Sequence, residues 1–281
     1  MRILEDHKPS TTQVLQGYAG LFSEDRTISY SLAYYFYKMK ATMDDMVAAE
    51  LESKDKDAEI KILDIGCNRG YDIFRMNKRF ANRNIYFTGL DISPVDIEYA
   101  NEVKTRHGLE KCRFFVGKAE NTDLEGNSFD IAICSEVLEH VPKSDLVLKE
   151  IHRILGNGGV GIITTPNAEN KTRKLKKFAP SWLKNGWNKP PQEHSEVEYS
   201  QKAECGFVNL PHISEKGVKE WIQISKDTGF KVEDVRRGSL MWGHEFFDEH
   251  PGLTGMLLFF DSILDKITYD FSPNFVMKIR K

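Results

Sequence analysis

The sequence predicts an α/β fold, a doubly wound and mostly parallel sheet of seven strands with helices between them. From about residue 60 onward, short apolar runs alternate with longer segments whose apolar residues recur at helical spacing. A glycine-rich turn directly follows the first apolar run, and the second run ends in an acid, Asp91. A strand, a glycine turn, a helix, a strand and a terminal acid form the nucleotide-binding half of such a sheet.

The seven strands and the helices follow in order along the chain. We expect strands at residues 61–65, 85–90, 112–116, 129–134, 160–165, 230–235 and 275–279. We expect helices at residues 71–80, 94–107, 146–155 and 214–228. Pro94 and Ser214 are typical of helix starts, and Gly108 and Gly229 are typical of helix ends. This alternation is what a parallel sheet requires.

Three segments lie outside the alternation. Residues 1–58 predict an N-terminal helical cap, because apolar and aromatic side chains recur at helical spacing over residues 28–52. Residues 59–281 then form the domain that holds the sheet. Within it, residues 168–211 are long for a connection and predict a lid insertion after the fifth strand. Residues 241–271 predict an additional amphipathic helix, which packs on the sheet or on a second subunit in a homodimer.

The composition is that of a soluble protein, with 40% hydrophobic residues and a formal net charge of −3. So small a charge gives no general argument for a nucleic-acid partner or an anionic membrane. The four cysteines (Cys67, Cys112, Cys134 and Cys205) are far apart, which argues against a cysteine zinc site and a disulfide framework. The start lacks the apolar core of a signal peptide, and no apolar run is long enough to span a membrane. A cytoplasmic location is therefore expected.

The glycine turn indicates which nucleotide binds. A dinucleotide fingerprint would read G-x-G-x-x-G, but Asn68 and Tyr71 stand at its second and third glycine positions. What remains, Asp64-x-Gly66-x-Asn68-x-Gly70, resembles motif I of the class I S-adenosylmethionine (SAM)-dependent methyltransferases. That motif has glycine at the middle position, and asparagine is among the residues that enter the left-handed region most easily. The resemblance implies a Rossmann-like fold and SAM as the cofactor.

SAM has an adenosine, a sulfonium and an amino-acid tail, and the resemblance implies a partner for each. The tail carboxylate would take backbone donors of the turn, contributed by Gly66, Cys67, Asn68 and Gly70. The tail ammonium would take Asp64 or a carbonyl near Cys134, and the ribose hydroxyls would take Asp91.

The adenine contact departs from the family pattern. In the family an aspartate of a Gly-Asp-Ala sequence after strand three commonly holds the adenine, whereas here Lys118 stands at the acid's position. A lysine cannot accept a hydrogen bond from the adenine amino group. The backbone around Ala119 or the carboxylate of Glu120 would do so instead, while Ile92 would cover one face of the ring.

The segment Glu136-Val-Leu-Glu-His140 resembles motif IV of the same family. If these residues form a helical turn, Glu136, Glu139 and His140 lie on one face beside the sulfonium. A SAM methyl group is already activated by positive charge, so the enzyme mainly aligns the reactants and removes a proton from a hydroxyl acceptor. His140 is the candidate base, because imidazole titrates near neutral pH.

The same face has ligands for a divalent metal. Ubiquinone-pathway O-methyltransferases and small-RNA 3′-terminal 2′-O-methyltransferases carry a Glu-x-x-Glu-His run at which a metal activates the hydroxyl. His212 stands where some of these enzymes place a further histidine. Many relatives with this run work without metal, so we expect none here. Proton removal or substrate contact, metal binding, and a purely structural turn remain the three interpretations.

The acceptor is the least determined part. The turns at residues 156–159, 164–167 and 211–214 resemble the bacterial branch of the family that modifies quinones, sugars, glycolipids and polysaccharide ends. We expect O-methylation of a small molecule or saccharide. RNA 2′-O-methylation is favoured by the five basic residues between Lys171 and Lys177 and opposed by the net charge. A SAM-binding protein without catalysis is the third hypothesis.

Overall fold

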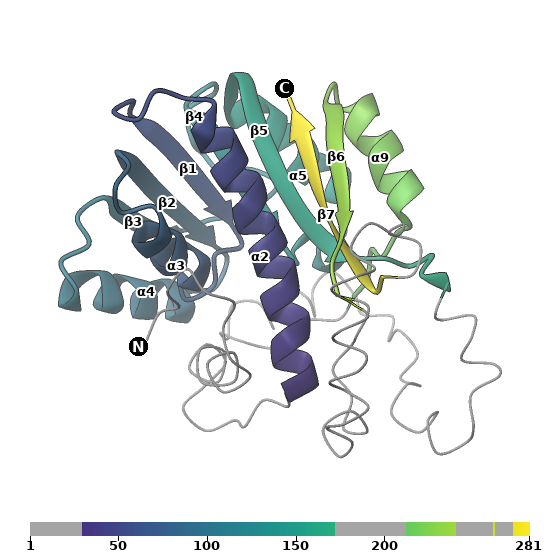
Figure 1. The fold of residues 1–281 in the computed structure, drawn as a ribbon, viewed down its shortest axis with the longest axis horizontal. Helices are drawn as coiled ribbons and strands as arrows, with labels where there is room; N and C mark the ends of the chain where they lie inside the picture. Colours follow the sequence, from purple (N-terminus) through teal and green to yellow (C-terminus); the bar gives the residue numbers. More distant parts are fainter. Residues whose placement is uncertain (1–29, 172–211, 240–260, 262–271) are drawn as a thin grey trace.

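The computed structural model describes residues 30–171, 212–239, 261 and 272–281, with side chains from residue 37 onward (Figure 1). Most of the predicted lid, residues 168–211, lies outside the described residues, as does the additional helix at 241–271 apart from Asp261. The predicted loop before residue 28 also lies outside them. In the part of the chain that the structure describes, no helix is long and apolar enough to cross a membrane.

The sheet has the seven predicted strands in the order β3-β2-β1-β4-β5-β7-β6. They are β1 (Ile60–Ile65), β2 (Ile85–Asp91), β3 (Cys112–Val116), β4 (Phe129–Ser135), β5 (Leu155–Pro166), β6 (Lys231–Arg237) and β7 (Asn274–Arg280). Only β7 is antiparallel to its neighbours, β5 and β6. The predicted doubly wound, mostly parallel sheet is therefore confirmed, and β5 begins earlier than expected because it includes the glycine-rich residues 156–159.

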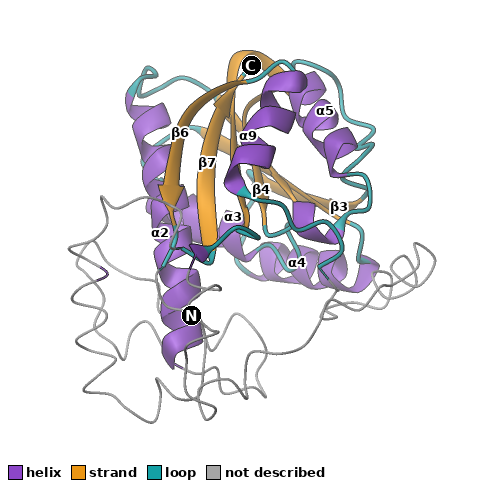
Figure 2. Cartoon of the chain, turned by 90° about the vertical axis from the view of Figure 1, so that its right-hand side faces the viewer, coloured by secondary structure: helices purple, strands orange, loops and turns teal. Residues whose placement is uncertain are grey.

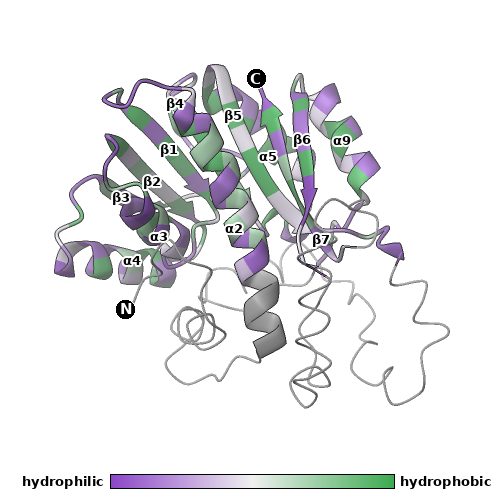
Figure 3. Cartoon of the chain, in the orientation of Figure 1, coloured by the Kyte–Doolittle hydropathy of each residue, from purple (hydrophilic) through white to green (hydrophobic). Residues whose placement is uncertain are grey.

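Helices cover both faces of the sheet (Figure 2). The strands alternate between two cores: Ile62 packs with α2 (Tyr30–Glu52), α3 (Tyr71–Arg79) and α4 (Pro94–Arg106), whereas Leu63 packs with α5 (Ser144–Ile154) and α9 (Val218–Asp227). In Figure 3 the central strands, such as β5, carry long hydrophobic stretches, whereas β6 at the edge is mostly hydrophilic and the helices show both kinds of residue. This is the pattern of a sheet buried on both faces.

The helix starts follow the sequence signals with one exception. Pro94 begins α4 as predicted, and the Ser93 side chain caps it by accepting from the Asp96 amide at 3.3 Å. The last predicted helix starts later than expected, because α9 begins at Val218 after Gly217. Ser214 does not cap it; its hydroxyl accepts from the Lys216 ammonium at 2.6 Å instead.

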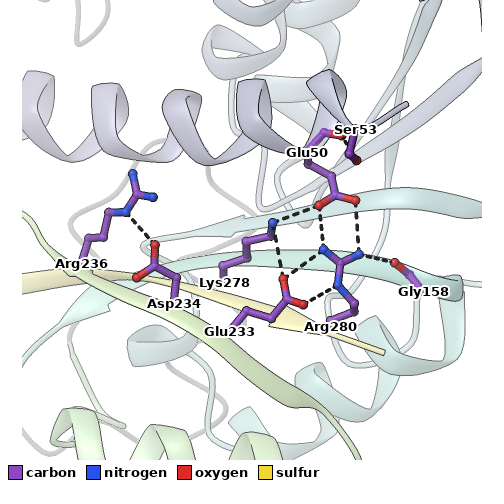
Figure 4. A network of polar contacts seen from close by, with 8 residues as sticks. All are labelled: Glu50, Ser53, Gly158, Glu233, Asp234, Arg236, Lys278 and Arg280. Atoms are coloured by element: carbon purple, nitrogen blue, oxygen red, sulfur yellow. Dashed lines mark hydrogen bonds and ion pairs between the residues drawn. The ribbon is translucent and has the colours of Figure 1, made fainter. Parts of the chain in front are cut away.

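The predicted N-terminal helix forms as α2 and packs on the sheet, contacting β5 and β7. Its buried apolar side chains, exposed by 3% or less, are Met39, Met43, Met46, Val47 and Leu51. Ion pairs hold its last turn on the sheet: Glu50 pairs with Lys278 at 2.9 Å and with Arg280 at 2.8 Å, both on β7 (Figure 4). Glu233 on β6 closes the network by pairing with Arg280 at 2.6 Å. Apolar contacts and a partly buried ion-pair network therefore fix α2 on this face.

The strand order places a ligand site at the carboxyl ends of β1 and β4. The chain proceeds outward from β1 to β3 and then returns to the other side of β1 with β4. In a doubly wound sheet, ligands bind in the crevice at this reversal. Asp64 on β1 is paired in register with Gly89 on β2 and Ile133 on β4, so the functional segments after these three strands meet at one edge.

Candidate active site

Asp64 lies at the carboxyl end of β1 and is 2% exposed. Its Oδ2 atom has no hydrogen-bond partner among the described residues. Burial, and next the charge of Asp72, raise the pKa of the Asp64 carboxyl well above its usual range. A buried carboxylate oxygen without a partner is costly unless a cation or donor joins it. Asp64 is therefore set up to receive a positively charged group.

Removing the Asp64 charge is expected to stabilise the empty protein. Asp64→Asn should raise the free energy of unfolding at pH 7 by about 1–3 kcal/mol, the scale of an uncompensated buried polar group. A carboxyl whose folded-state pKa lies above its unfolded value of about 3.9 lowers stability as pH rises through the folded pKa. The gain should therefore shrink toward pH 4. Urea unfolding across pH checks this, and a variant destabilised at pH 7 would contradict it.

The amides of the glycine turn already donate within the protein. Gly66 and Cys67 donate to the Leu90 carbonyl at 2.8 and 3.0 Å, and Asn68 donates to Asp91 Oδ2 at 2.8 Å. The amides of residues 69 and 70 donate to acceptors inside the turn, both at 2.8 Å. The sequence assigns these donors to a tail carboxylate, but the structure occupies them with the end of β2 and with the turn itself.

The turn needs its unusual residues for conformation and space. Gly66, Asn68 and Gly70 have φ values of 74°, 48° and 79°, in the left-handed region, as predicted for the asparagine. A Cβ on Gly66 would lie 2.3 Å from Val137 Cγ2, and one on Gly70 would lie 2.7 Å from Phe114 Cε1. The first glycine therefore lets the segment after β4 pack against the turn.

Asp91 joins the turn to the start of α4. Its Oδ1 accepts from the Ser93 amide at 2.9 Å and its Oδ2 accepts from the Asn68 amide at 2.8 Å. Burial raises the pKa of the Asp91 carboxyl, and the two amides act in the opposite direction. Each carboxylate oxygen can accept a second hydrogen bond. The half-buried Asp91 can thus hold the turn and still accept from a diol.

The segment after β3 lies beside Asp91. The Gly117 amide donates to the Asp91 carbonyl at 2.9 Å, and the Asn121 amide closes a turn onto the Lys118 carbonyl at 3.3 Å. Within that turn Ala119 and Glu120 are half-buried, whereas Lys118 is exposed. Ile92, the residue after Asp91, is also half-buried. The predicted adenine contacts therefore sit on neighbouring segments at this edge of the sheet.

Cys134 contributes only its backbone to the site. Its side chain is fully buried in the core, and burial, followed by the charge of Glu139, raises the pKa of the thiol well above its usual range. The cysteine is paired in register with Ile65 on β1. The expected carbonyl contact near residue 134 thus lies next to the end of β1, while the thiol has no role as a nucleophile.

Glu136 is not part of the helical turn that the sequence predicts. It adopts a left-handed conformation with φ of 56°, and the 3₁₀ turn that follows covers only Leu138–His140. The cause lies on β5: the Glu136 amide donates to the Thr164 carbonyl at 2.9 Å, and the Thr164 hydroxyl donates to Glu136 Oε1 at 3.0 Å. The predicted helical turn with Glu136, Glu139 and His140 on one face is therefore wrong, because Glu136 lies outside the turn.

Glu139 reaches the next residue of the same strand. The Thr165 hydroxyl donates to Glu139 Oε2 at 3.1 Å, whereas Oε1 is buried without a hydrogen-bond partner among the described residues. Burial, and then the charge of Glu136, raise the pKa of Glu139 well above its usual range. The pKa of Glu136 is raised by burial and opposed by its bond from Thr164. Two crowded carboxyl groups therefore face the end of β5.

His140 and His212 meet beside these acids. Their rings are in edge-to-face contact with centroids 4.9 Å apart, and His140 Nε2 lies 3.8 Å from Glu139 Oε1. Glu215 fixes the second histidine, because its carboxylate lies 2.6 Å from His212 Nδ1. Ligand atoms of Glu139, His140 and His212 all lie within 4.8 Å of one another, so this group has the donor set for a divalent metal.

Several residues of the site carry no signal that the sequence could reveal. Thr164 and Thr165 orient the two glutamates, and Glu215 orients His212. Lys40 on α2 pairs with Asp72 at the start of α3. Helical periodicity could place Lys40 on a helix, but its contact with α3 depends on how two distant helices pack.

A family model described as a methyltransferase domain matches residues 56–226. The match covers more than half of the chain, including β1 to β5, the glycine turn and the segment from Glu136 to His140. The chain belongs to this methyltransferase family.

Sequence relatives of this methyltransferase are distant. Sterol 24-C-methyltransferase erg-4 of Neurospora crassa is 26% identical over 85% of this chain and 56% of its own length. Sterol 4-C-methyltransferase strm-1 of Caenorhabditis elegans is 27% identical over 60% of this chain and 44% of its own. Ubiquinone biosynthesis O-methyltransferase of Pseudomonas aeruginosa is 28% identical over 40% of this chain and 46% of its own. The chain spans about half the length of the curated relatives it matches.

Solved structures share the fold. The [4+2]-cyclase SpnF aligns with a TM-score of 0.55 at 17% identity over 97% of both chains. The SAM complex of Haemonchus contortus phosphoethanolamine N-methyltransferase 2 aligns with a TM-score of 0.55 at 17% identity, over 97% of this chain and 57% of that one. At such identities the likeness shows the fold alone. One of these structures is a cyclase, so the shared fold does not identify the reaction or the acceptor.

SAM is the cofactor of this methyltransferase family, and the residues present fit it. Asp64 offers a buried oxygen that no described residue pairs with, which suits the tail ammonium. Asp91 keeps acceptor capacity for the ribose hydroxyls after its two amide bonds. When bound, SAM supplies a methyl group on a positively charged sulfonium.

Proposed function

We propose that this methyltransferase transfers the SAM methyl group to a hydroxyl oxygen of a small molecule or saccharide, with His140 as the base. The observation that carries the proposal is the position of His140. Its side chain is 19% exposed at the carboxyl end of β4, where it lies beside a fully buried Glu139. A histidine at this crevice can take a proton from an acceptor that lies in line with the sulfonium.

The neighbours of His140 suit proton removal. Glu139 Oε1 is 3.8 Å from His140 Nε2. The His212 ring packs against His140, and Glu215 holds the His212 ring. These contacts therefore position the ring for proton removal. In this proposal Glu139 and Glu136 act through His140 and the acceptor rather than as nucleophiles.

The relatives support a small-molecule acceptor. Their names refer to sterols and to ubiquinone biosynthesis, and the latter relative is named as an O-methyltransferase. A rice relative, 26% identical over 64% of this chain and 51% of its own length, is named for 2-methyl-6-phytyl-1,4-hydroquinone. We therefore place quinols first among the acceptors to be tested, ahead of the saccharides of the expected bacterial branch. Lys171 is the one residue of the basic run that is described, so the structure gives no support for RNA.

An acceptor screen with methyl-labelled SAM tests the proposal. Purified protein is incubated with quinols, catechols, saccharides, sterols and structured RNA, and the label is located in the product. We expect label on an oxygen of a quinol, catechol or saccharide. Label on a sterol carbon or on RNA would replace the proposed acceptor class. SAM binding without transfer to any member of the panel would favour a non-catalytic role.

Metal removal is expected to leave turnover unchanged. The proposed reaction needs a base and alignment, and His140 with its neighbours supplies both. Turnover after exhaustive EDTA treatment and gel filtration should remain within about twofold of that of the untreated enzyme. Loss of a catalytic metal would lower turnover by much more than this. A loss that Mn²⁺ or Mg²⁺ restores would contradict this and assign Glu139, His140 and His212 to a metal.

A further inference from the structure

Lys40 belongs to α2 but contacts the start of α3 and the carboxyl end of β4. Its ammonium pairs with the carboxylate of Asp72, the second residue of α3, and donates to the Ser135 hydroxyl at 2.9 Å. Ser135 is the last residue of β4. The side chain is 17% exposed. Lys40 therefore connects the helix that follows the glycine turn with the strand that precedes Glu136.

The cofactor's amino-acid tail needs a positive charge in this place. Its ammonium has a partner in Asp64, but its carboxylate must then lie close to two protein carboxyl groups, Asp64 and Asp72. The turn amides cannot offset this repulsion, because each of the five from residue 66 to residue 70 already donates elsewhere. A carboxylate placed among acids and partly removed from water requires a cation or several donors.

Two arginines near the turn are committed to other acids. Arg75 pairs with Asp44 and also donates to Asp72 at 2.8 Å, so Asp72 has a second cation besides Lys40. Arg69 donates from Nε to Asp96 at 2.9 Å, and its guanidinium lies 5.0 Å from the ring centre of Tyr99, on the α4 side of the turn. Lys40, by contrast, also reaches Ser135 at the end of β4.

Lys40 keeps a donor for a ligand. An ammonium has three N–H groups, and within the described residues Lys40 uses two of them, on Asp72 and Ser135. We infer that the Lys40 ammonium binds the carboxylate of the SAM amino-acid tail, with Asp72 and Ser135 holding it in place. Asp64 and Lys40 then form a matched pair of charges for the zwitterionic tail.

This contact also joins the cofactor to the acceptor side of the site. The Ser135 hydroxyl that accepts from Lys40 lies 2.9 Å from the Thr164 hydroxyl, which in turn donates to Glu136 Oε1 at 3.0 Å. The residues form one hydrogen-bonded path from α2 to the segment that carries His140. The inference concerns the cofactor and does not depend on the acceptor class proposed above.

The test compares SAM with decarboxylated SAM, two ligands that differ only in the tail carboxylate, by isothermal titration calorimetry. The unmodified protein should bind decarboxylated SAM roughly 10- to 100-fold more weakly, the scale of one charge-assisted hydrogen bond. Lys40→Met should weaken SAM by a similar factor and leave decarboxylated SAM within about twofold. The preference for the carboxylate should thus disappear. Lys40→Arg should retain part of the preference.

Lys54→Met is the matched control. Lys54 follows α2 and pairs with Asp130 at 3.2 Å, so its loss also removes a lysine ion pair. It should change the affinity for neither ligand. A Lys40→Met variant that keeps the full preference for SAM would overturn the inference, as would an equal loss for both ligands, which indicates a structural role. If Lys40→Met does not fold, Lys40→Gln replaces it. An unmodified protein without any preference for the carboxylate also overturns the inference.

Discussion

Asp91→Ala is expected to weaken SAM binding by at least roughly 100-fold, about 2.7 kcal/mol. Two effects add. The variant loses the acceptor for the ribose hydroxyls, and charge-assisted hydrogen bonds of this kind contribute about 1.5–3 kcal/mol each. It also releases the amides of Asn68 and Ser93, which Asp91 holds at 2.8 and 2.9 Å. Without that support the left-handed conformation at residue 68 loses one of its restraints.

Calorimetry with S-adenosylhomocysteine measures this effect without turnover. Asp145→Ala is a suitable control, because Asp145 pairs with Lys149 on α5 and its side chain is 51% exposed. The control should bind the ligand normally. An Asp91→Ala variant whose affinity stays within about twofold of the unmodified protein would show that the ribose is held elsewhere.

The predictable parts of the fold are those determined by residues close together in the sequence. Most strands are short apolar runs, and the glycine turn is defined by conformational needs within five residues. The seven strands and the left-handed Asn68 could therefore be derived from local patterns. The start of α4 was predictable for the same reason, since Ser93 and Pro94 act within a single turn of helix.

The parts that were not predictable depend on contacts between distant segments. Glu136 leaves the expected helical turn because Thr164, 28 residues later, holds both its amide and its carboxylate. The amides of residues 66, 67 and 68 are occupied because the end of β2 lies against the turn. His212 reaches His140 because the amides of residues 213 and 214 both donate to the Glu139 carbonyl, at 2.8 and 3.0 Å. None of these pairings has a local sequence signal.

His140→Ala is expected to lower kcat by roughly 100- to 10,000-fold, the range for loss of a general base. The affinity for SAM should stay within about twofold, because His140 packs on His212 and Glu139 rather than on the glycine turn or Asp91. With the acceptor found in the screen, steady-state kinetics and calorimetry measure the two quantities separately. His152→Ala is the matched control, since that ring makes a similar edge-to-face contact with Phe230 at 4.9 Å on the far side of α5.

A loss of rate in His140→Ala would not distinguish a base from a residue that only positions the acceptor. Measuring that loss with acceptors of different acidity does distinguish them. A hydroxyl that ionises more easily needs less help from a base, so the effect of His140→Ala should shrink along a series of increasingly acidic phenols. A constant loss across the series would assign His140 to positioning, and a fully active variant would remove it from the mechanism.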